Sequence, residues 1–292
     1  MKISAIILNY NNYQDLKACL ASLKSQELPD GSELRIMIID NGSHDASTAK
    51  IQMEEPQFIY LFNPDNLGFA RAANQGFAQL WSETDFFLLV NNDASLAPDC
   101  LRQLLAAQKD RPGLSGPAIL YKDKPDTLWQ GGGYFWKLRM NIAMPGKNQE
   151  LKEKGSRPTD FLSGCVLLIG RTTLAGIGLL DERFFFYGED LDLCLRAKKA
   201  GYPITYVPTA RAWHNLRSAS ADRSNPFVLY HLAYAYFLNI RRHFPKLISY
   251  GLFLFFFLYS PFRLGQIIKG GHGAKSIAAW FQGGVKGLTK KL

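Results

Sequence analysis

The amino-acid sequence predicts an α/β fold in which helices cover a doubly wound, mostly parallel sheet, followed by a helical C-terminal extension. Two observations predict this class. Short apolar runs alternate with helical patterns through about the first 120 residues, and a basic, hydrophobic stretch closes the chain. A chain of 292 residues accommodates one large domain with an appendage. We therefore expect a domain over 1–214, with halves at about 1–120 and 121–214, and an extension over 215–292.

The expected strands are short, apolar and rich in β-branched or aromatic residues, as in strands buried on both faces of a sheet. Leucines that share one face predict the first helix, and Pro98 occupies a favoured first-turn position of a later one. The charged segment 145–160 contains Pro and Gly, which predicts a loop able to close as a lid. Strands are expected at 2–10, 34–40, 58–63 and 85–91, and helices near 13–25, 68–81, 98–109 and 189–200.

The basic charge of the chain lies in its C-terminal quarter. Residues 215–292 hold 11 Lys/Arg and one acid, whereas 1–214 has a net charge of −1. A neutral body with a basic, apolar tail favours an anionic membrane surface over nucleic acid as a partner. The run 247–262 has 16 uncharged residues, too few to span a bilayer, and 275–291 has an amphipathic pattern. Packing on the 1–214 domain or on a second copy in a homodimer is the alternative.

The cysteines and the N-terminus indicate a location in the cytoplasm. The four cysteines are scattered without a C-x-x-C pair, as is typical of reduced thiols. The first apolar run has only six residues, and a signal peptide needs a longer one. Together with the basic tail, these features predict a cytoplasmic protein that is peripheral on the inner face of the cell membrane.

Polar residues follow each of the first four expected strands. They are Asn9-Tyr10-Asn11, Asp40-Asn41-Gly42-Ser43, the segment 63–74 and Asn91-Asn92-Asp93. In an open α/β sheet, ligands bind beyond the carboxyl ends of the strands, although turn chemistry alone also favours these residues. No G-x-G-x-x-G follows the first strand, and "GGHGAKS" (270–276) is not a phosphate-binding P-loop. A dinucleotide oxidoreductase and a P-loop enzyme are therefore disfavoured.

At this point the chain resembles the inverting family 2 glycosyltransferases of the GT-A fold, and within them the bacterial rhamnosyltransferase-like members. The segments that carry the resemblance follow the family order across residues 3–214: "AIILNYNN", "IIDNGSHDAS", "NPDNLGFARAANQGF", "LLVNNDASLAPD", "FLSGCVLLIGR" and "FFFYGEDLDLCLRAKKAGYPITYVPTARAWH". The family moves a sugar from a nucleotide diphosphate to an acceptor hydroxyl. The resemblance implies a nucleotide-diphosphate sugar donor and a saccharide or lipid-linked saccharide acceptor in cell-surface polysaccharide synthesis.

The resemblance also assigns residues to the donor. Asp40 would accept a hydrogen bond from the N3–H of uracil or thymine, and Arg71 would approach the phosphates, for which Arg is well suited. The alternatives are a turn for Asp40 and a solvated helix charge for Arg71. The donor-binding set is Asn9, Tyr10, Asp40, Asn66, Gly68, Arg71, Asn91, Asn92 and Asp93. dTDP-rhamnose is the preferred donor by resemblance, followed by UDP-sugars.

A divalent cation, Mg²⁺ or Mn²⁺, is implied in the same way. The usual Asp-x-Asp motif of the family reads Asn91-Asn92-Asp93 here, so one carboxylate remains and the diphosphate and water would supply further ligands. His214 matches a family histidine that completes the metal shell and makes Mn²⁺ plausible too. A lone histidine is otherwise more often structural than a ligand.

The catalytic residues implied by the resemblance are Asp190 and the adjacent Glu189. Asp190 matches the base that removes the proton of the acceptor hydroxyl, and neighbouring acids raise its pKa. Asp192 lies on another helix face, which favours a capping charge. An acidic first turn is also common in helices without any catalytic role. The aromatic residues 184–187 would wall the pocket and exclude water.

Acceptor recognition is assigned to aromatic side chains that stack on sugars: Trp129, Tyr134 and Trp136, with core packing as the alternative. Two other functions compete with sugar transfer. A nucleotidyltransferase making nucleotide sugars would ordinarily carry a Gly-rich, basic loop after the first strand, where "NYNNYQD" stands. A non-catalytic sugar- or lipid-binding module would not need Asp190.

Overall fold

The computed structural model describes residues 1–136, 141–216, 225–245, 251 and 273–291. Its strands are β1 (Lys2–Asn9), β2 (Glu33–Asn41), β3 (Ile59–Asn63), β4 (Phe86–Asn91), β5 (Ala94–Leu96), β6 (Leu114–Tyr121), β7 (Leu128–Gln130), β8 (Tyr134–Trp136), β9 (Asn141–Ala143), β10 (Arg157–Pro158), β11 (Val166–Gly170) and β12 (Ile204–His214). Its helices are α1 (Tyr13–Lys24), α2 (Ser47–Glu54), α3 (Phe69–Leu80), the 3₁₀ turn η1 (Trp81–Glu83), α4 (Cys100–Ala106), α5 (Arg171–Ile177), α6 (Glu189–Lys199), α7 (Pro226–His243) and α9 (Gly273–Thr289).

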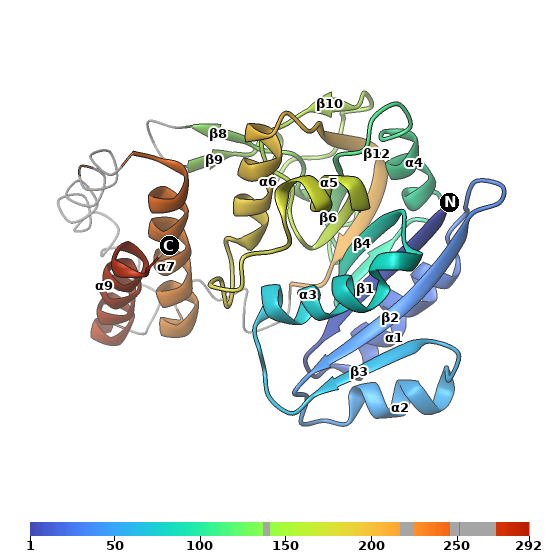
Figure 1. The fold of residues 1–292 in the computed structure, drawn as a ribbon, viewed down its shortest axis with the longest axis horizontal. Helices are drawn as coiled ribbons and strands as arrows, with labels where there is room; N and C mark the ends of the chain where they lie inside the picture. The colour runs from blue at the N-terminus through green and yellow to red at the C-terminus, as the bar shows by residue number, and fades with distance from the viewer. Residues whose placement is uncertain (137–140, 217–224, 246–250, 252–272, 292) are drawn as a thin grey trace. The chain divides into compact units, whose positions relative to one another are not determined.

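A central sheet runs in the order β10-β12-β6-β11-β4-β1-β2-β3, with β5 paired to β12 and β7 to β6 (Figure 1). The half β4-β1-β2-β3 is parallel, as the sequence predicts. The other half is mixed, because β11 runs antiparallel to both β4 and β6. A parallel partner would need a long crossover, usually a helix, and the described residues between β6 and β11 form only strands and turns. The expectation of a mostly parallel sheet is therefore wrong for this half.

Helices cover both faces of the sheet (Figure 1). Ile3, Ala5 and Ile7 of β1 pack in the core that contains the buried residues of α1 and α4. Ile6 belongs to the opposite core, with residues of α3 and α6. This alternation follows from the two-residue period of a strand and explains why β1 is apolar along its whole length. The α/β class and the eight elements expected from the sequence are confirmed, whereas α2 and α5 were not anticipated.

Part of the expected lid is fixed by backbone hydrogen bonds. Asn148 N–H donates to the Leu128 carbonyl at 2.8 Å, and Leu128 N–H donates to the Gln149 carbonyl at 2.9 Å. Leu151 N–H donates to Asp126 at 2.9 Å. Residues 148–151 therefore form a flank of β7, and this part of 145–160 does not have the open backbone that a lid requires.

The chain divides into two compact units. The first contains Met1–Arg183 and Asp190–Leu216, and the second contains Phe184–Glu189 and Arg217–Leu292. The expected extension over 215–292 thus shares its unit with a short segment from within the expected catalytic domain. That segment immediately precedes Asp190.

In the second unit, α7 and α9 run parallel and pack closely. A Cβ added to Gly283 would lie 2.1 Å from the Tyr230 carbonyl oxygen, and one added to Gly287 would lie 2.3 Å from that of Tyr234. Glycine is required at both positions because the two backbones touch there. The helix expected within 275–291 is confirmed as α9, and the apolar run 247–262 lies almost wholly outside the described residues. No helix in the described part of the chain is long and apolar enough to cross a membrane.

Candidate active site

The polar ends of the parallel strands meet at one edge of the sheet. Asn9 lies opposite Asp40 in the pairing of β1 with β2, and Leu8 lies opposite Asn91 in the pairing of β1 with β4. Asn41 lies opposite Asn63 on β3. Because all four strands point the same way, the loops that follow them start side by side. This is the edge at which open α/β sheets bind ligands.

Asn9 is fully buried and ties three of these loops together. Its amide nitrogen donates to Ser47 Oγ at 2.7 Å and to Thr48 Oγ1 at 2.9 Å, both in the first turn of α2. Its amide oxygen accepts a hydrogen bond of 2.6 Å from Asn92, in the turn after β4. A buried amide with these partners positions loops, so contact of its side chain with a donor stays a prediction.

Asp40 is nearly buried, with 6% of its surface exposed. One carboxylate oxygen accepts a hydrogen bond of 2.7 Å from Ser43 N–H, as in the turn that the sequence offers as an alternative. The other oxygen has no partner among the described residues. Asp40 can therefore form the turn with one carboxylate oxygen and accept a hydrogen bond from a nucleobase with the other. Tyr10, 46% exposed, follows β1 at the same edge of the sheet, with its ring edge-on to His44.

Asn41, which the donor-binding set predicted from the sequence omits, holds the loop that enters α3. Its amide oxygen accepts hydrogen bonds from Leu67 N–H at 3.1 Å, and its nitrogen donates to Asn66 Oδ1 at 3.0 Å. It also donates to the Gly68 carbonyl at 3.3 Å. Gly42 allows this approach, because a Cβ there would lie 2.6 Å from the Asp65 backbone. In the sequence, Asn-Gly directly after a strand could have indicated this residue, but the same pattern is typical of an ordinary turn.

Arg71 lies in the first turn of α3 and is exposed. It has no hydrogen bond or ion pair among the described residues. An exposed arginine without a partner, close to the positive end of a helix, is suited to phosphate oxygens. The Arg71 guanidinium is therefore available to a ligand, and its contact with the donor phosphates stays a prediction.

Asp93 and His214 lie together although 121 residues separate them, with 2.9 Å between carboxylate Oδ1 and ring Nε2. The antiparallel pairing of β5 with β12 sets His214 opposite Ala94 and so brings it beside Asp93. Burial lowers the pKa of His214, but Cys165 and the Asp93 carboxylate outweigh it and raise that pKa to about 10. The Trp129 ring lies against the imidazole, with centroids 4.5 Å apart.

The donor set of this pair, a carboxylate oxygen and an imidazole nitrogen in contact, is one that suits a divalent cation. Both side chains are largely buried, with 8% and 12% of their surfaces exposed. No group of three or more His, Cys, Asp or Glu side chains arranged for a metal occurs in the described part of the chain. A cation here would need further ligands from a bound diphosphate or water.

Asp190, the predicted base, is held against the loop before β11. Its carboxylate accepts hydrogen bonds from Gly164 N–H at 3.2 Å and from Leu191 N–H at 2.8 Å. Burial raises the pKa of Asp190, and these two donors offset the rise only in part. Cys165, the next residue of the loop, neighbours His214 and accepts a hydrogen bond from Asn91 N–H. Two consecutive loop residues therefore link the base to the Asp93–His214 pair.

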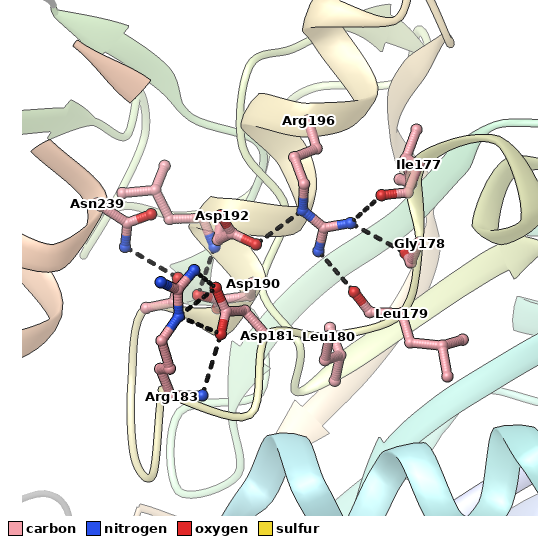
Figure 2. Close-up of polar contacts among 12 residues, drawn as sticks. Ile177, Gly178, Leu179, Leu180, Asp181, Arg183, Asp190, Asp192, Arg196 and Asn239 are labelled. Atoms are coloured by element: carbon pink, nitrogen blue, oxygen red, sulfur yellow. Dashed lines mark hydrogen bonds and ion pairs between the residues drawn. The ribbon is translucent and has the colours of Figure 1, made fainter. Parts of the chain in front are cut away.

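Asp192 is fully buried and pairs with Arg196 at 2.8 Å, one helical turn on (Figure 2). The guanidinium of Arg196 also donates to the carbonyls of Ile177, Gly178 and Leu179 at 2.6–2.9 Å. The expectation of a capping charge for Asp192 is wrong, because its buried carboxylate forms an ion pair with Arg196, a side chain that is 12% exposed. Arg183 and Asp181 form a further ion pair in the loop between α5 and α6 (Figure 2). Glu189, adjacent to the base, is buried.

The aromatic run before α6 packs on α7. Phe184 is buried in a cluster with Tyr234, Ala235 and Leu238. The Phe185 ring stacks on His231, with centroids 5.3 Å apart. The expectation that residues 184–187 wall a substrate pocket is therefore wrong for Phe184, which serves as a core residue of the second unit.

Of the three predicted acceptor residues, the structure describes the side chains of Trp129 and Tyr134, which lie against different partners. Trp129 contacts His214, as described above. Tyr134 accepts a hydrogen bond of 3.1 Å from Arg157, whose guanidinium also lies over the ring of Tyr206. The side chain of Trp136 lies outside the described residues. Only Trp129 is thus seen beside a predicted metal ligand.

Comparison with known proteins adds four findings. Residues 4–171 match the model of the family described as glycosyl transferase family 2. The chain is 30% identical over 265 residues to the N-acetylglucosaminyl-diphospho-decaprenol L-rhamnosyltransferase of Mycobacterium tuberculosis, covering 82% of this chain and 84% of that protein. It is 24% identical to the low-salt glycan biosynthesis hexosyltransferase Agl10 of Haloferax volcanii, covering 73% and 67%. The crystal structure of GalNAc-T7 with UDP, GalNAc and Mn²⁺ superimposes with a TM-score of 0.62 at 16% identity, covering 82% and 47%, and this likeness shows the fold alone.

Replacement of Arg196 by Ala is expected to destabilise the first unit by about 3–5 kcal/mol, because it leaves the buried Asp192 carboxylate without its partner. Urea unfolding measures the effect. Lys199→Ala, at an exposed position of the same helix, is the control and should change the free energy of unfolding by less than about 0.5 kcal/mol. Equal effects of the two substitutions would contradict the role given to this ion pair.

Proposed function

Because the chain belongs to glycosyl transferase family 2, we propose that it transfers a sugar from a nucleotide diphosphate to an acceptor hydroxyl, with inversion at the anomeric carbon. One observation carries the proposal. Asp190 and the Asp93–His214 pair are joined through Gly164 and Cys165, consecutive residues of one loop. A base for the acceptor and a charge-stabilising pair for the donor diphosphate are thus neighbours in a single domain.

Donor binding is assigned to the edge formed by β4, β1 and β2. The unpartnered oxygen of Asp40 is suited to accept the N3–H of a pyrimidine base, and the exposed Arg71 to contact phosphate oxygens. Similarity to a rhamnosyltransferase supports dTDP-rhamnose as the donor, with UDP-sugars next. Asn9, Asn41 and Asn92 hold the loops in place, so that the donor meets a preorganised surface.

Asp93 and His214 would hold the divalent cation, Mg²⁺ or Mn²⁺, whose chemistry is to neutralise the charge of the departing diphosphate. Asp190 removes the proton of the acceptor hydroxyl as that oxygen attacks the anomeric carbon, and the bond to the diphosphate breaks on the opposite face. Burial raises its pKa, which makes it a stronger base than an ordinary aspartate. The proton thus moves from the acceptor oxygen to a carboxylate oxygen of Asp190.

The acceptor is proposed to be a saccharide or lipid-linked saccharide of a cell-surface polysaccharide. The mycobacterial relative is named for a sugar linked to diphospho-decaprenol, which supports a lipid-linked saccharide as the acceptor. The second unit supports a location on the cytoplasmic face of the membrane. Its α9 presents Lys286 at an open apolar groove lined by Phe281 and Val285, and Lys290 and Lys291 follow the helix as exposed residues.

Asp190→Asn is expected to lower kcat by about 10²- to 10⁴-fold, because the amide cannot take the proton of the acceptor. The KM for the donor should stay within about twofold, since the donor contacts lie on other strands. Release of the nucleoside diphosphate in the presence of acceptor measures both constants. Asp110→Asn, at an exposed loop position, is the matched control. Full activity of the Asp190 variant would remove the base from the mechanism.

Binding of nucleotide should depend on metal through Asp93 and His214. We expect dTDP or UDP to raise Tm in the presence of Mn²⁺ or Mg²⁺, and the shift to be lost in Asp93→Ala and in His214→Ala. A thermal-shift panel of nucleotides with and without each metal tests this. Asp99→Ala, in the segment that precedes α4, is the control. A nucleotide shift that does not change with metal would count against the cation.

Replacement of Lys286, Lys290 and Lys291 by Glu is expected to weaken binding to anionic vesicles by about 100-fold or more, because each basic residue near such a surface contributes about 1 kcal/mol. Co-sedimentation with phosphatidylserine vesicles measures this. The same change at Lys109, Lys124 and Lys199, all exposed in the first unit, is the control. Equal pelleting of all three proteins would exclude membrane docking through α9.

A further inference from the structure

We propose that Asn239 is a positioning residue for the catalytic base, acting from α7 through the turn that precedes α6. The inference rests on the proposed function of Asp190 and adds a residue that neither the family motifs nor the comparisons assign. It begins with the shape of the turn. Tyr187 and Gly188 both have left-handed backbone conformations, with φ of 66° and 91°. Two such residues in succession form a turn that needs outside support, because the first carries a side chain.

The surface of α7 supplies this support at three points. Phe184 is 1% exposed and inserts between Tyr234, Ala235 and Leu238. Gly188 lies directly against the helix, since a Cβ added there would be 2.6 Å from the Ala235 Cβ. The amide nitrogen of Asn239, a residue labelled in Figure 2, donates to the Gly188 carbonyl at 3.0 Å. All of these residues belong to the second unit of the chain.

Asn239 is an unusual residue for its place. It is 3% exposed in the middle of a helix whose neighbouring buried residues are apolar. Its nitrogen also donates to the Ala235 carbonyl at 3.1 Å, and its oxygen has no partner among the described residues. Burying an amide with one unsatisfied oxygen costs free energy that a leucine would not cost. The amide, unlike a leucine, can donate a hydrogen bond to the Gly188 carbonyl, and this bond is its specific contribution.

The effect on Asp190 follows from the chain itself. A single residue, Glu189, separates Gly188 from Asp190, and α6 begins at Glu189. The first turn of a helix lacks backbone acceptors for its N–H groups and frays unless it is held. The Asn239 bond fixes the point from which α6 starts. It thereby orders the first turn of α6, which carries the Asp190 carboxylate.

The test separates positioning from stability. Asn239→Leu removes the donor but leaves an apolar residue of similar size, so Tm should be kept or raised. We expect kcat to fall about 10- to 100-fold with the donor KM unchanged, because a base displaced by about 1 Å loses that much rate. Asn239→Ser should act alike, since a short hydroxyl bonds to its own helix and does not reach Gly188. Ile240→Ala, a buried cavity variant of the same helix, should lower Tm with little change in kcat.

Hydrogen exchange provides a readout that does not depend on turnover. Backbone amides of residues 184–193 should exchange about fivefold faster or more in both Asn239 variants than in the wild type, and less so in Ile240→Ala. Unchanged exchange in the Asn239 variants overturns the inference, as does a loss of kcat in Ile240→Ala equal to that of Asn239→Leu. If the wild-type protein transfers no sugar, the proposed function fails, and the exchange result still decides whether Asn239 holds the turn.

Discussion

The carboxyl edge of the parallel sheet depends on one buried amide. Asn9 ends the central strand β1 with no exposed surface, and its polar atoms must find partners inside the protein. These partners lie in α2 and in the turn after β4, so the hydrogen bonds of this one side chain fix both segments relative to β1. Asn41 does the same for the loop that enters α3. The edge is therefore rigid where a donor is proposed to bind, and Asp40 and Arg71 keep free acceptor and donor groups on it.

The charged groups of the proposed mechanism are arranged around a second constraint, the loop before β11. Its Gly164 N–H stabilises the carboxylate of Asp190, and its Cys165 adjoins His214. The loop owes its position to β11, which pairs with β4 in the antiparallel direction and places residue 165 beside Asn91. The mixed half of the sheet is thus what brings the predicted base close to the predicted metal pair.

The segment "FFFYGEDLDL" contains residues with three different roles, which the sequence alone does not distinguish. Phe184 is a core residue of the second unit, Asp190 is the proposed base, and Asp192 is a buried partner of Arg196. Residues of one ten-residue segment thus belong to the core of the second unit, to the proposed reaction site and to the interior of the first unit. This arrangement makes α6 sensitive to whatever holds its first turn, and α7 provides that hold.

The sequence alone determined the α/β class, the parallel half of the sheet and the family, because strands buried on both faces and polar strand ends leave periodic, ordered signals. It also singled out Asp93, Asp190 and His214 through their motifs. It did not reveal the antiparallel course of β11, the core position of Phe184 or the buried pairing of Asp192. These depend on contacts between residues distant in the chain, such as the 121-residue separation that β5 and β12 close between Asp93 and His214. Only the tertiary structure decides which of several identical carboxylates is buried, paired or left available to a ligand.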